Sequence, residues 1–206
     1  MTYPTVLSIL MATTPDRNGM FTALYNEVMR QVTYCHTTHP SLGRIEVHVD
    51  DSKRFLDGGL SIGGKRQALL DKATGYYVCY LDSDEEISPC YVEVLLRQCQ
   101  FNADCVTFRN LTKTETFWVV VDMSINYPND QINPKTEVRR NVWHVCPIKT
   151  TFAKLYRFED TNYGEDESWM NNVRKHITTE AHTDAIIHCY RHGKHSSADE
   201  ITRNGK

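Results

Sequence analysis

The sequence predicts an α/β fold with an open, mostly parallel sheet, helices on both of its faces, and mixed strands in the second half. Apolar runs that suit buried strands alternate with segments of helical period through the first half of the chain. No internal repeat, low-complexity stretch or flexible spacer divides the 206 residues, and this length suits one domain. Three of the expected strands end in polar loops, where open sheets of this kind bind their ligands.

The first strand and helix are expected at the start of the chain. The run Thr5–Ala12 is almost wholly apolar, as in a strand that is covered on both faces. Apolar residues then recur every three or four positions over residues 21–32, which places them on one face of a helix. A second strand is expected at residues 45–49.

The third strand is expected at residues 76–81, after a short helix that opens at Gly63 and Gly64. Ser88 as the N-cap and Pro89 as the first helical residue predict another helix directly after this strand. Because the carboxyl ends of parallel strands share one edge, the loops that follow the three strands should converge on one ligand site. These loops are residues 13–17, Asp50 with Asp51, and Asp82 with Asp84.

The second half is expected to add antiparallel strands and an acceptor-facing surface. Short apolar segments predict strands at residues 105–108, 117–121, 138–143 and 186–190, with a helix near 148–156. The tail from residue 196 is short and polar.

Composition and charge indicate a soluble cytoplasmic protein. No stretch is apolar for long enough to cross a bilayer, and the first apolar run lacks the basic flank of a signal peptide. The seven cysteines are odd in number and most lie in apolar patterns, which fits a reducing compartment. A net charge of -3 does not indicate a polyanion-binding protein.

The acidic turn Asp82, Ser83 and Asp84 is the first candidate site. Two carboxylates one residue apart at a strand end can both reach a hard divalent cation, which prefers oxygen ligands and can grip a diphosphate. A solvated acidic turn that favours the next helix is the simpler interpretation of an isolated Asp-x-Asp. The position after a buried strand, with Glu85 and Glu86 beside it, favours the cation site.

Gly164, Glu165 and Asp166 form the second candidate site. A glycine turn places two adjacent carboxylates immediately before an amphipathic segment. Either carboxylate can act as a general base if it lies within hydrogen-bond reach of an acceptor proton. Acidic residues that complement the dipole of a helix N-terminus explain the same motif without chemistry.

His188, Cys189, His192 and His195 are the third group, near the end of the chain. A structural zinc site usually needs a closed set of four ligands, and no Cys-x-x-Cys accompanies these residues. A single histidine, His188, that reaches back to the cation held by the carboxylate pair is the more economical interpretation. A histidine without chemistry is the alternative.

The chain resembles glycosyltransferase family 2 and related enzymes of the GT-A fold from about Val6 to His192. The most specific match is GGKRQALLDKATGYYVCYLDSDEEISPCYV, which is similar to the family's run from a glycine and basic pair to its DxD motif. SILMATTPDR and VDDS resemble the first two strand ends, and HVCPIKTTFAKLYRFEDTNYGEDESW resembles the acceptor segment that leads into the ED motif. Signatures of rival folds, namely GxGxxG, the Walker loop, GxSxG and HExxH, are missing.

This resemblance implies a hexosyl- or pentosyltransferase of GT-A (Rossmann-like) fold. It would move a sugar from a nucleotide-sugar, expected to be a UDP-sugar, to an acceptor hydroxyl with inversion. Mn²⁺ or Mg²⁺ would be held by Asp82 and Asp84 with His188, and Asp166 would be the base, with Glu165 as its rival. The resemblance places the nucleotide against Thr13, Thr14, Pro15, Arg17, Asp50, Asp51, Lys65, Arg66, Asp82 and Ser83. The single domain, 1–206, is then divided into a donor half (about 1–110), an acceptor half (about 111–195) and a tail (196–206).

Two other functions are kept beside this one. A nucleotidyltransferase would share the sheet, the cation and the nucleotide, but it should carry a glycine-rich basic loop where this chain has TTPDRNG. A nucleotide-sugar-binding module without catalysis is the second, and retention of both acidic motifs argues against it. A glycan, a protein and a modified nucleic-acid base are all candidate acceptors.

Overall fold

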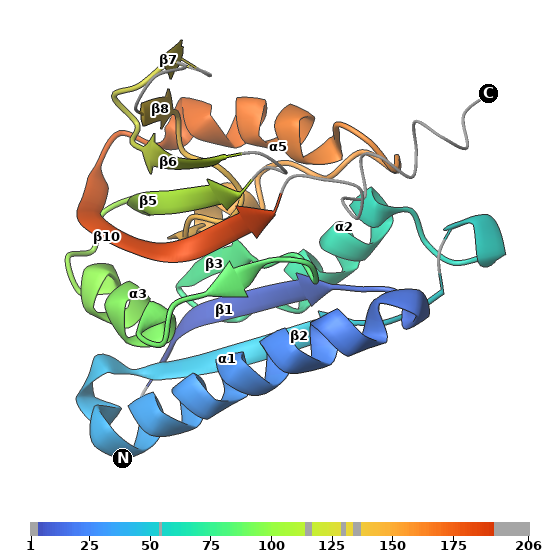
Figure 1. Ribbon diagram of the computed structural model, residues 1–206, viewed down its shortest axis with the longest axis horizontal. Coiled ribbons are helices and arrows are strands. Elements are labelled where there is room, and N and C mark those ends of the chain that lie inside the picture. Colours follow the sequence, from blue (N-terminus) through green and yellow to red (C-terminus); the bar gives the residue numbers. More distant parts are fainter. Residues whose placement is uncertain (1–3, 54, 114–116, 129–130, 134–136, 192–206) are drawn as a thin grey trace.

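The computed structural model is a mixed α/β structure around one sheet of ten strands (Figure 1). It describes residues 4–53, 55–113, 117–128, 131–133 and 137–191. His192, His195 and the expected tail lie outside these residues.

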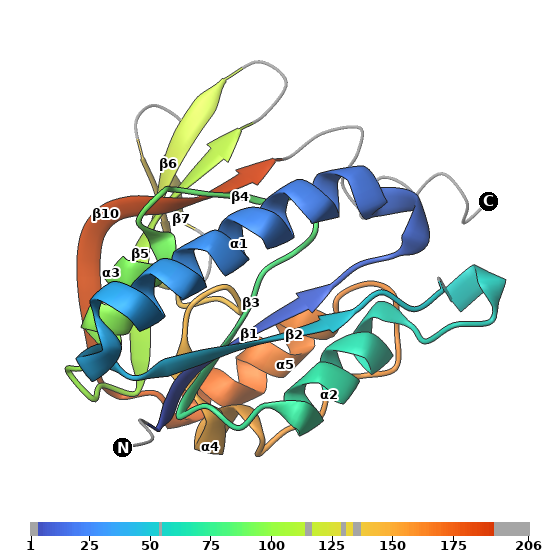
Figure 2. The ribbon, with the colours of Figure 1, turned by 90° about the horizontal axis from the view of Figure 1, so that it is seen from below.

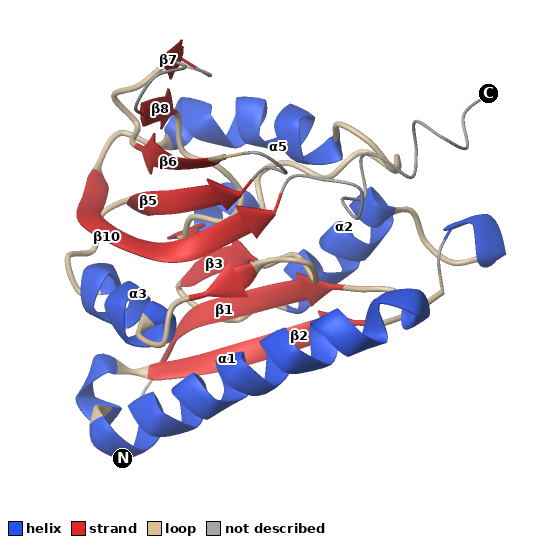
Figure 3. Cartoon of the chain, in the orientation of Figure 1, coloured by secondary structure: helices blue, strands red, loops and turns tan. Residues whose placement is uncertain are grey.

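Helices cover both faces of the sheet (Figures 2 and 3). Helices α1 and α3 pack together on one face, and α2, α4 and α5 lie on the other, where α2 also contacts α5. The helices are α1 (Asn18–Thr38), α2 (Ile62–Lys72), α3 (Tyr91–Cys99), α4 (Thr150–Ala153) and α5 (Glu165–Val173), with short 3-10 turns at Pro15–Arg17, Pro40–Leu42, Phe55–Asp57 and Arg174–His176. No helix of the described chain is both long enough and apolar enough to cross a bilayer.

The sheet follows the order β2-β1-β3-β9-β5-β6-β8-β7, and β10 pairs with β5 and β4. Strand β1 is parallel to β2 and β3, whereas the two-residue β9 is antiparallel to both β3 and β5. The strands are β1 (Thr5–Ala12), β2 (Arg44–Asp50), β3 (Tyr77–Tyr80), β4 (Glu86–Ile87), β5 (Cys105–Lys113), β6 (Trp118–Met123), β7 (Gln131–Asn133), β8 (Glu137–Arg140), β9 (Ile148–Lys149) and β10 (Glu180–Arg191).

The order of elements in the first half agrees with the sequence prediction. Strand β1 has the expected bounds, and β2, β3 and α2 lie within a few residues of theirs. Helix α1 is longer than the periodic segment over residues 21–32 and extends to Thr38. These elements were predictable because burial in the core gives them a regular apolar pattern in the sequence. Residues 7–12 and all of β3 are buried, so their apolar pattern is continuous.

The expected start of α3 at Ser88 and Pro89 is wrong. The helix begins at Tyr91, after Cys90, which supplies no side-chain cap. Its open N–H at Val92 donates instead to the side-chain carbonyl of Gln31 on α1, at 3.0 Å. The cap is therefore a long-range contact between α1 and α3, which a local sequence pattern cannot report.

The second half has longer strands and a shorter helix than expected. Strands β5 and β10 extend well beyond residues 105–108 and 186–190, β8 ends at Arg140, and the helix expected over 148–156 is split into β9 and α4. Strand β10 bends strongly (Figure 2), and its register against β5 shifts between Thr183 and His188, just before the residues that also pair with β4. The added part of β5 is mostly half-buried, and that of β10 mixes half-buried and exposed residues, so a search for apolar runs finds only fragments of these strands.

Candidate functional site

The loops that follow β1, β2 and β3 meet at one edge of the sheet, as the parallel order requires. The Thr13 N–H donates to the Asp50 carbonyl at 2.8 Å, which joins the first two strand ends. The Lys65 ammonium, from α2, lies between them and donates to the carbonyls of Thr13 (2.7 Å) and Ser52 (2.5 Å). Arg17 then joins the first loop to the third, with its Nη1 3.2 Å from Oδ2 of Asp84.

Arg66, on α2, connects the acidic turn to the second acidic motif. Its Nη2 donates to both carboxylate oxygens of Asp82, at 3.0 and 3.1 Å, and its Nε is 3.3 Å from Oε1 of Glu165. The guanidinium is almost wholly buried, and its carbon lies 5.4 Å from the ring centroid of Tyr80. Burial lowers the pKa of Arg66, but the surrounding carboxylates outweigh it and the net shift is upward.

His144 makes a second connection between the two acidic motifs. Its Nδ1 is 3.3 Å from Oδ2 of Asp166, and its Nε2 is 3.8 Å from Oδ2 of Asp82. Burial and the nearby Arg66 lower the pKa of His144, yet Asp166 and Asp82 more than compensate, so its pKa is raised. Arg66, Asp82, His144, Glu165 and Asp166 are called the central ion-pair network below.

Glu165 and Asp166 differ in what they face. Glu165 has a side chain only 6% exposed, and it points at Arg66. Asp166 is 24% exposed and faces His144. Burial raises the pKa of both, but for Asp166 the contact with His144 reverses the shift and lowers it below the ordinary value, whereas the pKa of Glu165 stays raised. Asp166 is therefore the ionised carboxylate that solvent or an acceptor can reach.

Asp84 carries a charge that its surroundings do not fully compensate. Burial raises its pKa to about 6, and the neighbouring carboxylates of Asp82 and Glu85 add to the effect, while Arg17 opposes it. A cation brought to this turn would relieve the repulsion between these carboxylates.

His188 lies behind the acidic turn. It is buried on β10, and its Nε2 is 2.9 Å from Oε2 of Glu85. The same Glu85 oxygen accepts the N–H of Asp82 at 2.9 Å. His188 is thus linked to the turn through Glu85, and its expected contact with a cation stays a prediction.

The N-terminus of α2 is closed by protein groups. The Ser61 hydroxyl accepts the N–H of Gly64, Asn162 accepts that of Ile62, and the Thr161 carbonyl accepts that of Gly63. A Cβ at Gly63 would overlap the carbonyl oxygen of Glu159. Both Lys65 and Arg66 already bind protein oxygens, and their expected contacts with a diphosphate stay predictions.

The remaining expected nucleotide contacts line the ends of β1 and β2. Thr13 is buried, and its hydroxyl has no hydrogen-bond partner among the described residues. Thr14 is half-buried, Pro15 and Asp51 are exposed, and Ser83 is buried within the acidic turn. A free hydroxyl at the bottom of these loops is suited to a polar ligand atom.

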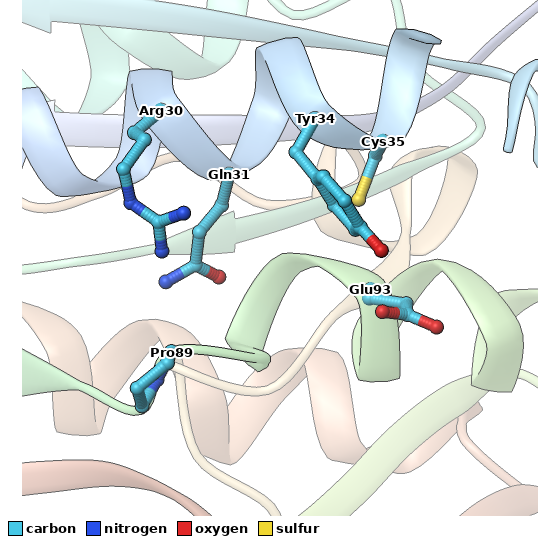
Figure 4. Close-up of a pocket in the computed structure, with 6 residues that line it drawn as sticks. All are labelled: Arg30, Gln31, Tyr34, Cys35, Pro89 and Glu93. Carbon is cyan, nitrogen blue, oxygen red and sulfur yellow. The ribbon is translucent and has the colours of Figure 1, made fainter. Parts of the chain in front are cut away.

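A hollow between α1 and α3 lies apart from these residues (Figure 4). Its volume is about 260 Å³. It is lined by Arg30, Gln31, Tyr34, Cys35, Pro89 and Glu93, none of which belongs to the candidate site.

A model of the family "Glycosyl transferase family 2" matches residues 54–164, more than half of the chain. The chain belongs to glycosyltransferase family 2. The matched segment contains Arg66, Asp82, Asp84 and His144, and it ends at Gly164, directly before Glu165.

Solved structures agree with the family in fold. The chain is similar to S. aureus TarS residues 1–349, with 13% identity and a TM-score of 0.60 over 91% of this chain and 60% of that one. It is also similar to TarS 1–349 in complex with UDP-GlcNAc (11% identity, TM-score 0.59, 94% and 60% covered) and with UDP (13%, 0.57, 97% and 64%). The chain thus spans less than two thirds of these structures, and no curated protein matches it by sequence.

The donor atoms present fit the divalent cation that members of this family commonly use. Two carboxylates on one turn suit a hard cation that takes its other ligands from phosphate oxygens and water. Among the described residues, no three His, Cys, Asp or Glu side chains are grouped so as to hold a metal. Binding of a cation by Asp82 and Asp84 stays a prediction.

The sequence analysis missed the roles of His144 and Glu85. His144 opens the segment that resembles the family's acceptor region, but it stands in no motif of its own. Its partners lie 62 positions before it and 22 after it in the chain, so no local pattern pairs them. The only available signal was that a lone histidine lies between two apolar residues, Trp143 and Val145.

Proposed function

We propose that this chain is a glycosyltransferase that moves a sugar from a nucleoside diphosphate donor to an acceptor hydroxyl. The observation that carries the proposal is that the two acidic motifs form one ion-pair network at the carboxyl edge of the sheet. A transferase needs its two acidic motifs close enough to act on the same substrate, because one motif binds the leaving diphosphate and the other activates the attacking hydroxyl. Membership of glycosyltransferase family 2 supports the reaction class.

On this proposal, Asp84 and Asp82 hold Mn²⁺ or Mg²⁺, with Asp84 as the principal ligand. Asp82 already accepts two hydrogen bonds from Arg66, whereas Asp84 has an excess of negative charge around it. The cation, when bound, supplies positive charge that stabilises the departing diphosphate. The nucleoside then lies against the loops after β1 and β2, where Thr13 has an open hydroxyl.

Asp166 acts as the base. As the acceptor oxygen forms its bond to the anomeric carbon, its proton passes to Asp166, and the bond from that carbon to the phosphate oxygen breaks. The diphosphate leaves with the electron pair. Attack from the face opposite the leaving group inverts the anomeric configuration. Glu165 is less suited to this role because it is buried against Arg66.

The donor we propose is a UDP-sugar, because the structurally similar TarS has been solved with UDP and with UDP-GlcNAc. The seven cysteines are all free, which supports a reducing, cytoplasmic location.

Analysis of the released nucleotide tests the proposal. The protein is incubated with a panel of UDP-sugars and Mn²⁺, and donor turnover is followed by phosphate-specific chromatography. Release of UDP supports sugar transfer or slow donor hydrolysis. A parallel reaction is given UTP, a sugar 1-phosphate and Mn²⁺, and release of pyrophosphate there would identify the alternative nucleotidyltransferase. Binding of donor without any turnover would support the non-catalytic module.

A further inference from the structure

His144 is held in place independently of the carboxylates that it contacts. Its backbone carbonyl accepts the N–H of Tyr80, in β3, at 3.0 Å. The Tyr80 ring lies edge-on to the imidazole, with 6.2 Å between the ring centroids, and the His144 side chain is only 6% exposed. A ring fixed by a strand and an aromatic neighbour has few orientations available, so it can impose an orientation on a partner.

The carboxylate of Asp166 is contacted at both of its oxygens. Oδ2 is 3.3 Å from Nδ1 of His144, and Oδ1 accepts the backbone N–H of Glu167 at 2.8 Å. Contacts on different oxygens restrict the plane of a carboxylate. The hydrogen bond comes from the same helix, and the ion-pair contact with the imidazole comes from a distant turn.

The two nitrogens of His144 face different partners. Nδ1 faces Asp166, and Nε2 faces Asp82 at the longer distance of 3.8 Å. Arg66 is the other charged group that packs around these carboxylates, and it contacts Asp82 and Glu165. Asp166 therefore depends on His144 for its side-chain partner, whereas Asp82 also has Arg66.

We infer that His144 is a positioning residue for Asp166. Its Nδ1 contacts the Asp166 carboxylate and orients that group so that an oxygen lone pair faces the acceptor hydroxyl. This inference rests on the proposed function, because it assigns Asp166 the role of base. His144 itself touches no reacting atom. Its loss should reduce the rate of transfer and leave donor binding unchanged, since the donor turn keeps Arg66.

Two amide substitutions separate the nitrogens of His144. The amide nitrogen of Asn occupies nearly the place of Nδ1, and that of Gln nearly the place of Nε2. His144→Asn should therefore keep the donor to Asp166, and His144→Gln should lose it. Both variants remove the same ring from the same buried place, so a role in packing alone would affect them alike.

The experiment measures kcat for UDP release from saturating UDP-GlcNAc with Mn²⁺ and with water as the acceptor, the Kd for UDP-GlcNAc, and the melting temperature, for both variants beside Asp166→Asn. We expect His144→Gln to lose about 10²-fold in kcat, the scale of a catalytic group misplaced by about 1 Å, and His144→Asn about tenfold or less. The donor Kd should stay within about threefold of the wild-type value in both. Equal losses in the two variants, or a larger loss in His144→Asn, would overturn the inference.

A second measurement covers the case in which the variants unfold. The ¹⁵N spectrum of histidine-labelled wild-type protein should show His144 Nδ1 carrying a proton, and Asp166→Asn should shift that resonance more than Asp82→Asn does. An Nδ1 signal insensitive to Asp166→Asn would contradict the positioning role. If Asp166→Asn retains normal transfer, the proposed base is wrong, which is a different failure from the failure of His144 to orient it.

Discussion

The carboxylates at the two edges of the sheet are held in opposite ways. At the amino edge, Glu46 accepts hydrogen bonds from the Ser8 hydroxyl (2.6 Å), the Thr74 N–H (2.6 Å) and hydroxyl (2.8 Å), and the Gly75 N–H (3.2 Å). Burial raises its pKa, but these bonds outweigh burial and lower it to about 2. At the carboxyl edge, burial and the neighbouring carboxylates together raise the pKa of Asp84 to about 6, although Arg17 opposes the shift.

Asp104 repeats the pattern of the amino edge. It accepts hydrogen bonds from the Lys149 ammonium, from the N–H and hydroxyl of Thr178, and from the N–H of Thr179. These bonds hold its pKa below the usual range. Several directed hydrogen bonds, most of them from backbone N–H groups and hydroxyls, therefore mark the carboxylates that hold loops together. Carboxylates that face charges and one another mark the edge where we place the chemistry.

The largest effect should come from removing the proposed base at the carboxyl edge. Asp166→Asn should reduce the rate of transfer by about 10²- to 10⁴-fold, because a positioned base contributes on that scale. Donor affinity, measured by calorimetry, should hardly change. The control is Glu165→Gln, which should weaken the contact with Arg66, and a larger rate loss in this control would reverse the assignment.

A steric change at the same edge should be nearly as severe but should act on stability. Gly63→Ala should destabilise the fold by about 3 kcal/mol or more, because its Cβ would overlap the Glu159 carbonyl and overpacking against backbone is not relieved by a side-chain move. The measurement is urea unfolding. Gly19→Ala, in α1 with no neighbour near the added methyl, should be neutral or stabilising by up to about 1 kcal/mol.

At the amino edge, Glu46→Gln should destabilise the protein by about 2 kcal/mol at pH 7, because several bonds to a charged acceptor are weakened. Since its folded pKa is lowered, the contribution of Glu46 is fully present above its unfolded pKa and disappears as the pH falls toward about 2. The difference in unfolding free energy between wild type and variant should therefore shrink between about pH 4.5 and pH 2. If the difference in unfolding free energy stays constant over this pH range, Glu46 does not have the lowered pKa on which the contrast with Asp84 depends.

The smallest effect has the opposite sign. Asp84→Asn should stabilise the cation-free protein at pH 7 by about 1 kcal/mol, because an ionised group whose folded pKa is raised opposes folding above that pKa. The same variant should lose cation-dependent binding of UDP. Thermal melting in EDTA tests the first expectation and calorimetry with Mn²⁺ the second. Destabilisation in EDTA would show that the pair with Arg17 outweighs the repulsion.

The sequence was sufficient to predict the secondary structure where successive residues along the chain are buried. Strand β1 and the loop ends after β1, β2 and β3 were predictable because apolar runs and parallel order determine them. Both acidic motifs were also visible as patterns. Their connection was not, because Arg66 and His144 reach them from α2 and from the turn after β8.

The same reason explains the errors of the fold prediction. The Gln31 cap of α3 is a contact across 61 positions, and the polar half of β10 lacks the apolar run of a buried strand. Local patterns report what a residue does with its near neighbours. They do not report which distant element satisfies an open hydrogen bond.

Strand β9 has a consequence for how the chain reaches this structure. Ile148 pairs with Val78 of β3 and with Cys105 of β5, so two residues from late in the chain join the early strands to the rest of the sheet. When only residues 1–110 have left the ribosome, β3 can pair with β1 but not with β9, which has not yet been released. The pairing of β9 with β3 and β5 requires contacts between residues far apart in the sequence. Such contacts form slowly, and the edge of β3 stays exposed until they form. The nascent chain is therefore expected to need chaperone protection until residue 149 has left the exit tunnel.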